Sequence, residues 1–241
     1  MNDRLILPDA AAVAQTAADR FVALARSAIA ANEQFTVALS GGSTPKAMLA
    51  RLIDQPLDWA HIHVFWGDER CVSPEDVDSN YRMACEALLN HVPIPEQNVH
   101  RMQGEINPTQ AASNYTAELR AMFGRVEWPH FDLILLGLGT DAHTASLFPG
   151  TSAIHEEQRW VIGHFVESLK TYRITLTPPV INHAKNVIFL VAGTDKAAAV
   201  RSVLLRDSID ADQFPAQSVQ LMAGQLTWLI DQAAAADLPA A

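Results

Sequence analysis

Residues 131–150 read FDLILLGLGTDAHTASLFPG, a sequence that predicts a buried strand and the turn that follows it. A short apolar run that ends in glycine, here residues 131–136, is typical of a strand buried on both faces, as in a parallel sheet. Open α/β sheets bind their ligands just beyond the carboxyl ends of such strands. Asp141 and His143 lie in that turn, and we interpret them as a candidate acid/base pair, although a structural histidine is the alternative.

Predicted strands and helices alternate on both sides of this stretch. The apolar patterns predict strands at residues 35–40, 61–66, 131–136, 160–165, 173–177, 187–191 and 226–230, and helices at residues 10–31, 45–53, 79–90, 108–123 and 195–205. This alternation predicts an α/β fold with a mainly parallel, doubly wound sheet and helices on both faces. No internal repeat, low-complexity linker or block of like charges interrupts the pattern, so we expect a single domain over residues 1–241.

The composition narrows the class of protein. The chain of 241 residues has 49% hydrophobic and 18% charged residues and a formal net charge of −10, which argues against a nucleic-acid or anionic-membrane binder. Cys71 and Cys85 are too few for a disulfide framework and have no metal-ligand spacing, so no metal site is predicted. The first residues lack a signal-peptide pattern, and no apolar run approaches ~20 residues. We therefore expect a cytoplasmic protein that acts on a small molecule, as a monomer or a weak homo-oligomer.

A glycine-rich loop, SGGSTPK at residues 40–46, follows the first predicted strand of the alternating pattern. Gly41 and Gly42 allow the backbone to approach a ligand closely and to adopt positive φ. Ser43 or Thr44 can cap the helix that follows, and the amides at a helix N-terminus bind anions, with phosphate the natural ligand. The alternative is a strand-to-helix turn without a ligand. The loop lacks the spacing of an ATP-binding loop, so a nucleoside triphosphate is not expected.

Charged residues near other strand ends are candidates for binding an anion. Asp68 and Arg70 follow the strand at residues 61–66 and could orient a polyol or an anion, although a surface salt-bridge cluster is the alternative. Lys196 could reach a phosphate held by the glycine-rich loop, although an exposed helix lysine is the default. Arg173 opens its strand and suits either packing or anion binding. Because parallel strands end at one edge of a sheet, we expect these loops to converge.

One competing pattern overlaps the turn. Residues 137–142 formally match the G-x-G-x-x-[GA] sequence of dinucleotide-binding folds, with Glu156 or Glu157 near the acidic position expected for ribose. Pro149-Gly150 leaves little room for the long helix that this motif opens. Asp141 would also place a negative charge where the pyrophosphate binds. The dinucleotide interpretation is therefore the weaker one.

The motifs taken together resemble those of one family. Over nearly the full length of the chain they follow the order found in the 6-phosphogluconolactonase family: SGGSTP at 40–45, DER at 68–70, SN at 79–80, GLGTDAHTASLFPG at 137–150, RITLT at 173–177 and GTDK at 193–196. The resemblance implies a modified Rossmann-like fold, no metal or organic cofactor, and hydrolysis of 6-phospho-D-glucono-1,5-lactone to 6-phosphogluconate in the pentose phosphate pathway. It also implies that His143 is the main catalytic residue, with the glycine-rich loop, Arg70 and Lys196 near the substrate.

The chemistry of a δ-lactone suits these residues. Its hydrolysis needs a positioned water, a base and some stabilisation of charge. We expect His143 to take a proton from the attacking water and to return it to the ring oxygen, while Asp141 orients the imidazole. A covalent route through Ser146 is less favoured, because no G-x-S-x-G sequence surrounds it. The family's usual Asp-Gly-His is Asp-Ala-His here, and Ala142 would cost on the order of 1 kcal/mol if its position needs positive φ.

Two alternative functions use the same scaffold. A glucosamine-6-phosphate deaminase or isomerase shares the Gly-Gly loop and the Asp-x-His turn, but its turn continues into a Phe-Asn-Glu-Pro segment whose carboxylate assists ring opening. Here the matching residues 146–149 read SLFP, and DER at 68–70 replaces that family's DEY. The other alternative is a non-enzymatic sugar-phosphate sensor, and the presence of Asp141 and His143 argues against it.

Overall fold

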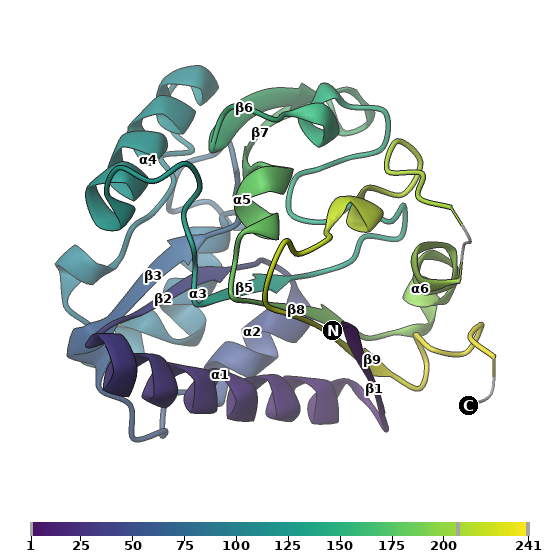
Figure 1. The fold of residues 1–241 in the computed structure, drawn as a ribbon, viewed down its shortest axis with the longest axis horizontal. Helices are drawn as coiled ribbons and strands as arrows, with labels where there is room; N and C mark the ends of the chain where they lie inside the picture. The colour runs from purple at the N-terminus through teal and green to yellow at the C-terminus, as the bar shows by residue number, and fades with distance from the viewer. Residues whose placement is uncertain (1, 206–207, 240–241) are drawn as a thin grey trace.

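The structure is a computed structural model that describes residues 2–205 and 208–239, and a six-stranded parallel sheet forms its centre (Figure 1). The order across the sheet is β1-β9-β8-β5-β2-β3. The strands are β1 (Asn2–Leu7), β2 (Phe35–Leu39), β3 (Ile62–Trp66), β5 (Leu133–Leu136), β8 (Asn186–Val191) and β9 (Gln225–Asp231). The predicted parallel sheet is therefore confirmed. The patterns did not predict β1, which pairs with β9 at the edge of the sheet.

Side chains of the parallel strands alternate between two cores, one on each face of the sheet. In β5, Leu133 and Leu135 belong to one core, and Ile134 and Leu136 belong to the other. The first core includes residues of α1 (Ala10–Asn32), α2 (Ser43–Ala50) and α3 (Asn80–Ala87), and the second includes residues of α4 (Pro108–Phe123), α5 (Pro178–Asn182) and α6 (Ala197–Leu204). Figure 1 shows α1 and α4 on opposite sides of the sheet, which confirms the predicted covering of both faces.

A second, antiparallel sheet corrects one part of the prediction. It consists of β4 (Asp68–Arg70), β7 (Thr171–Leu176) and β6 (Val161–Val166), in that order. The strands predicted at 160–165 and 173–177 therefore do not join the parallel sheet. Only the short turn η5 (Glu167–Leu169) and Lys170 separate β6 from β7, and a parallel pairing needs a crossover of a dozen or more residues.

The ends of the helices show where local sequence signals succeed. Helix α4 has the predicted bounds, with the Asn107 side chain accepting hydrogen bonds from two backbone amides of its first turn. Helix α2 begins at Ser43 with Gly42 as its N-cap at φ 108°, so the expectation that Ser43 or Thr44 caps it is wrong.

No helix in the described part of the chain is long and apolar enough to cross a membrane. Short 3₁₀ turns occur at Trp59–His61, Leu89–His91, Glu96–Asn98, Ser152–His155, Thr194–Lys196 and Pro215–Ser218.

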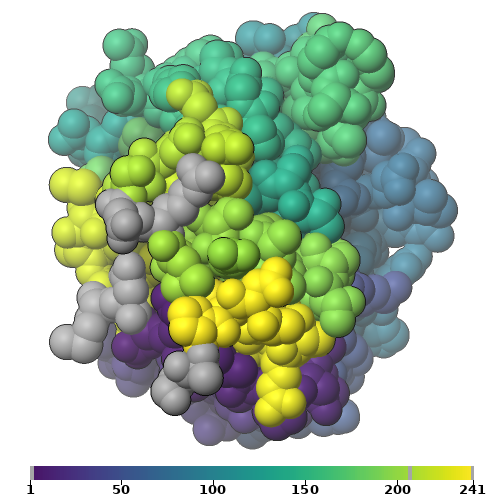
Figure 2. Space-filling view, turned by 90° about the vertical axis from the view of Figure 1, so that its right-hand side faces the viewer, coloured from purple at the N-terminus to yellow at the C-terminus, as the bar shows by residue number. Residues whose placement is uncertain are grey.

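The order of the strands locates the place where a ligand can bind. From β2 the chain passes to β3 on one side, and then to β5, β8 and β9 on the other side. The gap between the loops that follow β2 and β5 is therefore a topological switch point, where open α/β sheets bind ligands. The first and the last strand of the chain, β1 and β9, pair at the far edge of the sheet, and in Figure 2 the purple N-terminal and yellow C-terminal parts of the described chain lie next to each other.

Candidate active site

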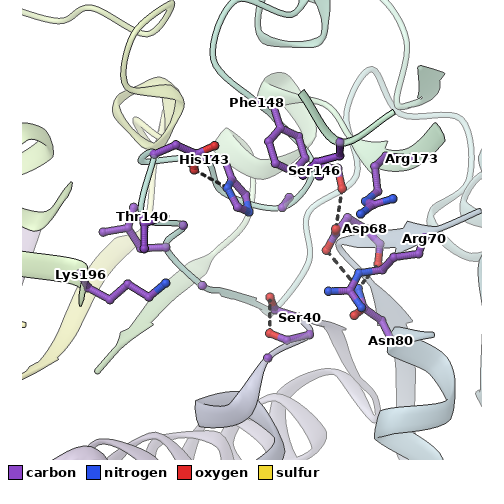
Figure 3. Close-up of a pocket in the computed structure, with 18 residues that line it drawn as sticks. Ser40, Asp68, Arg70, Asn80, Thr140, His143, Ser146, Phe148, Arg173 and Lys196 are labelled. Carbon is purple, nitrogen blue, oxygen red and sulfur yellow. Dashed lines mark hydrogen bonds and ion pairs between the residues drawn. The ribbon is translucent and has the colours of Figure 1, made fainter. Parts of the chain in front are cut away.

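A cavity of about 440 Å³ lies beyond the carboxyl ends of β2 and β5, at this switch point (Figure 3). Loops from the parallel sheet form one part of its wall, and the antiparallel sheet forms another. The lining residues are Ser40, Gly41, Gly42, Asp68, Arg70, Asn80, Gly137, Leu138, Gly139, Thr140, Asp141, His143, Ala145, Ser146, Phe148, Leu169, Arg173 and Lys196.

Most of the residues singled out in the sequence meet in this cavity. Those that line it are Gly41, Gly42, Asp68, Arg70, Asp141, His143, Arg173 and Lys196. Ser43 and Thr44 are not in the lining, and both already belong to α2, which begins at Ser43. The predicted convergence of the strand-end loops is thus observed, with the glycine-rich loop represented by its two glycines.

Asp141 and His143 form a hydrogen-bonded pair. The carboxylate Oδ1 of Asp141 lies 2.5 Å from Nδ1 of His143 and also accepts the backbone N–H of His143 at 3.2 Å. The imidazole stacks on the ring of Phe148, with 4.1 Å between the ring centroids, and its Nε2 edge faces the cavity (Figure 3). Burial raises the pKa of the Asp141 carboxyl, but hydrogen bonding and charge from His143 outweigh this and leave the pKa below its ordinary value.

The backbone of the turn brings the two side chains together. The Ala142 N–H donates to the carbonyl of Gly139 at 3.0 Å, and the Gly139 N–H donates to the carbonyl of His143 at 2.8 Å. A Cβ atom on Gly139 would lie 2.0 Å from Nδ1 of His143 and 2.5 Å from Oδ1 of Asp141. Only glycine fits at this position while the pair is intact. No long helix follows in residues 137–151, which argues against the dinucleotide interpretation.

Asp68 is buried in the opposite wall, where it contacts Ser146 and Asn80. Its Oδ2 accepts the hydroxyl of Ser146 at 2.6 Å, and its backbone carbonyl accepts the side-chain amide of Asn80 at 3.0 Å. Asn80 also abuts the glycine-rich loop, because a Cβ on Gly41 would lie 2.0 Å from its Oδ1. Ser79 provides the N-cap of α3, and the family resemblance includes the pair Ser79-Asn80. No local pattern indicates the contacts of Asn80 with Asp68 and with the glycine-rich loop, because those partners lie on other elements.

Three cations surround the remaining space. Arg70 and Arg173 are cross-strand partners on β4 and β7, so both side chains lie on the same face of the antiparallel sheet. Burial and the neighbouring charge of Arg70 lower the pKa of Arg173. Lys196 enters from the opposite side of the cavity in Figure 3, 3.2 Å from the carboxylate of Asp195. Two adjacent guanidinium groups repel each other, and a bound anion would relieve that repulsion.

A metal site in the described part of the chain would need His, Cys, Asp or Glu side chains grouped as ligands. Within residues 2–205 and 208–239, no group of three or more His, Cys, Asp and Glu side chains has an arrangement that could hold a metal ion. The arrangement of side chains in the cavity instead supports proton transfer next to an anion-binding surface. The hydrogen-bonded pair can transfer a proton, and the cations can bind an anion.

Comparisons with known proteins agree along most of the chain. The family model described as glucosamine-6-phosphate isomerases/6-phosphogluconolactonase matches residues 8–228. A Nostoc protein named 6-phosphogluconolactonase is 42% identical over 236 residues, which is 97% of each chain. A Synechocystis protein of the same name is 47% identical over 215 residues, which is 88% of each chain. The solved structure of the 6-phosphogluconolactonase from Trypanosoma brucei matches with a TM-score of 0.86 at 30% identity and covers 99% of both chains.

Proposed function

The chain belongs to the glucosamine-6-phosphate isomerase/6-phosphogluconolactonase family, and we propose that it hydrolyses 6-phospho-D-glucono-1,5-lactone to 6-phosphogluconate in the pentose phosphate pathway. The observation that carries the proposal is the Asp141–His143 pair, in which Nδ1 lies 2.5 Å from the carboxylate while Nε2 faces the cavity. Two relatives named 6-phosphogluconolactonase, 42% and 47% identical to this chain, support the same activity.

In the first step His143 acts as a general base. Nε2 takes a proton from a water molecule as the water oxygen forms a bond to the lactone carbonyl carbon. Asp141 keeps the N–H of the neutral imidazole on Nδ1, which leaves Nε2 as the acceptor, and it stabilises the imidazolium that forms. The stacked ring of Phe148 restricts rotation of the imidazole. The base is therefore oriented before substrate binds.

In the second step the same imidazole acts as a general acid. The tetrahedral intermediate collapses, the bond between the carbonyl carbon and the ring oxygen breaks, and Nε2–H of His143 gives its proton to that oxygen. The products are the open-chain acid and the neutral histidine, so no further group is needed to complete the cycle. Negative charge on the carbonyl oxygen is favoured by the surrounding cations.

The cationic wall supports recognition of the phosphate and the sugar. Arg70, Arg173 and Lys196 supply donors and positive charge on two sides of the cavity. Gly41 and Gly42 place backbone N–H groups at the start of α2, where the helix dipole favours an anion. Ser43 and Thr44 can contribute there only through their backbone amides. Asp68 can accept a sugar hydroxyl beside its bond to Ser146. These contacts orient the lactone next to His143.

Two other chemistries fit the cavity less well. Attack by Ser146 is disfavoured, because the residue is 1% exposed and its hydroxyl donates to Asp68 at 2.6 Å. Deamination and isomerisation of glucosamine 6-phosphate need a carboxylate in the segment after the histidine. Residues 146–149 contain none.

The test is a hydrolysis assay of 6-phosphogluconolactone generated in situ, corrected for its spontaneous opening. We expect the wild-type protein to accelerate hydrolysis and His143→Ala to lose roughly 10²–10⁴-fold in kcat, the usual contribution of a general acid–base group. Unphosphorylated gluconolactone serves as the second substrate, for which we expect a much lower kcat/KM. Circular dichroism and thermal unfolding confirm that the variant is folded.

Three results would contradict parts of the proposal. No acceleration by the wild type would remove the lactonase assignment, and glucosamine 6-phosphate turnover and binding of 6-phosphogluconate without turnover would then be measured. An unchanged rate in folded His143→Ala would remove the histidine from the mechanism. Equal kcat/KM for both lactones would show that the cations do not bind phosphate.

A further inference from the structure

Ser146 lies three residues after His143, at the end of the same turn, and its polar groups bond to three different strands. Its hydroxyl donates to Oδ2 of Asp68 on β4 at 2.6 Å. Its backbone N–H donates to Oγ1 of Thr175 on β7 at 3.3 Å. Its carbonyl accepts Nε2–H of His164 on β6 at 2.8 Å. All the strands of the antiparallel sheet therefore contribute one bond each to this residue.

The register of the antiparallel sheet explains why these partners point the same way. Asp68 pairs with Thr175, and Thr175 pairs with Ile162, which lies two residues before His164 on the same strand. Alternate residues of a strand share a face, so Asp68, Thr175 and His164 project from one face of the sheet. That face is turned toward the catalytic turn. Phe165 and Tyr172, on the opposite face, are 42% and 49% exposed.

The two halves of the cavity come from different sheets. His143 and Asp141 follow β5 of the parallel sheet, whereas Asp68, Arg70 and Arg173 lie on the antiparallel sheet. Relative movement of the two sheets would change the distance from the base to the cations. The catalytic turn spans this gap at Ser146, in a region where Ser146 and Asp68 are 1% and 7% exposed.

We propose that His164, acting through Ser146, is a positioning residue that holds the catalytic turn against the antiparallel sheet and so sets the place of His143 relative to Arg70 and Arg173. The inference rests on the proposed lactonase function for its readout. His164 is half-buried, is not in the lining of the cavity and touches no part of the space where substrate binds. It acts at a distance, through a backbone carbonyl.

The environment of His164 suits a fixed neutral donor. Burial lowers its pKa, and the charge of Arg173, its cross-strand partner, adds to that effect, while the bond to the carbonyl of Ser146 opposes it. The neutral ring with its hydrogen on Nε2 donates to the carbonyl without adding a third charge to the row formed with Arg70 and Arg173. A donor without charge is therefore what this position requires.

Loss of the hydrogen bond between His164 and the carbonyl of Ser146 would shift the residues that neighbour Ser146 in the turn. Phe148, two residues on, stacks on the imidazole of His143, so a shifted turn misaligns the base. Arg70, Arg173 and Lys196 stay attached to their own elements. We therefore expect kcat to fall while KM for the phosphorylated lactone changes little. A residue that served only the stability of the sheet would lower the melting temperature without changing kcat per folded molecule.

Two amide variants of His164 separate these possibilities. The nitrogen of glutamine reaches the place of Nε2, whereas the nitrogen of asparagine reaches only the place of Nδ1. We expect His164→Gln to keep kcat within about twofold of wild type and His164→Asn to lose roughly tenfold, with KM within about threefold in both. As a second pair, Thr175→Ser keeps the acceptor for the Ser146 N–H and Thr175→Val removes it. We expect only the valine variant to lose kcat.

The outcomes distinguish this inference from the proposed function. If the wild type hydrolyses the lactone, and His164→Gln and His164→Asn have the same kcat per folded molecule as each other, the positioning role is wrong and the lactonase assignment stands. The same conclusion follows if the loss lies in KM alone. If the wild type has no lactonase activity, the assignment itself fails. Should His164→Asn not fold, the Thr175 pair decides.

Discussion

Ala142 has a backbone conformation that ordinarily favours glycine. Its φ is 63°, and it lies between Asp141 and His143 in the chain. The left-handed region costs an L-residue roughly 1–2 kcal/mol. The alanine that replaces the glycine of the family's Asp-Gly-His therefore does lie at a position of positive φ.

Packing offsets this strain. The methyl group of Ala142 is buried, with 1% of the residue exposed, and burial of one such group contributes about 0.8 kcal/mol. Its carbonyl accepts the backbone N–H of Ala216 at 3.0 Å, which ties the turn to a segment near the C-terminus. Alanine also has fewer unfolded conformations than glycine, which contributes a further 0.4–1 kcal/mol or so. The opposing terms are of similar size.

We expect Ala142→Gly to change the free energy of unfolding by less than about 1 kcal/mol and to keep the lactonase rate. Ala142→Val adds a β-branched side chain to the same φ in a buried site, and we expect it to destabilise the protein by more than about 2 kcal/mol and to reduce kcat. Chemical denaturation and the lactonase assay measure both. A valine variant as stable and active as the wild type would show that the turn adapts and that φ at this position is not constrained.

At the scale of the element, the turn after β5 depends on its two glycines in different ways. A Cβ on Gly139 would overlap both His143 and Asp141, as close as 2.0 Å. A Cβ on Gly137 would have the hydroxyl of Ser40 as its nearest neighbour at 3.8 Å, an ordinary contact. Both positions are glycines in the turn after β5, and they differ in whether an added side chain would overlap Asp141 and His143.

We expect Gly139→Ala to lower kcat by roughly a hundredfold, because the methyl group must displace the imidazole from its carboxylate. Gly137→Ala, the matched control, should retain far more of the activity. Both variants are compared by steady-state kinetics after their folding has been checked by circular dichroism. Equal losses in the two variants would mean that the chain needs glycine at both positions for reasons other than the Asp141–His143 contact.

At the scale of the whole molecule, two histidines link stability to pH. Burial lowers the pKa of His63, with the charges of His100 and His61 adding to the effect, and burial also lowers the pKa of His164. In the unfolded chain both groups titrate near pH 6.5. Below that pH the unfolded state therefore binds more protons than the folded state does. The stabilisation from the neutral histidines is present above about pH 6.5 and is lost as the pH falls toward the folded pKa values.

We expect the free energy of unfolding to decrease between about pH 7.5 and pH 5.5, and this decrease to be smaller in His63→Gln. His63 lies outside the cavity, with Nδ1 3.1 Å from Nε2 of His100. Glu69 acts in the opposite direction, because burial raises its pKa despite three backbone hydrogen bonds and so favours the folded state at low pH. Comparing the wild type with His63→Gln isolates the histidine, since Glu69 is common to both. Identical pH dependence in the two proteins would exclude His63 as a contributor.

Within the cavity, sequence patterns located the residues that follow directly after the strands. Gly41, Gly42, Asp141 and His143 follow buried strands, and the parallel sheet delivers them to one cavity. The patterns failed for the Ser43 cap, because Gly42 already adopts the N-cap position. They also gave no sign of His164 or of the contacts that Asn80 makes, which depend on partners from other elements.

By itself, the amino-acid sequence determined the alternating strands and helices, the bounds of α4, and the glycine turns that present Asp141 and His143. Each of these depends on apolar periodicity, capping or backbone freedom within a few neighbouring residues. Only the tertiary structure decided that β4, β6 and β7 form a separate antiparallel sheet, that Arg70 pairs with Arg173, and that Ser146 bonds to three strands. These contacts join residues far apart in the chain, and their register depends on packing that no local pattern specifies.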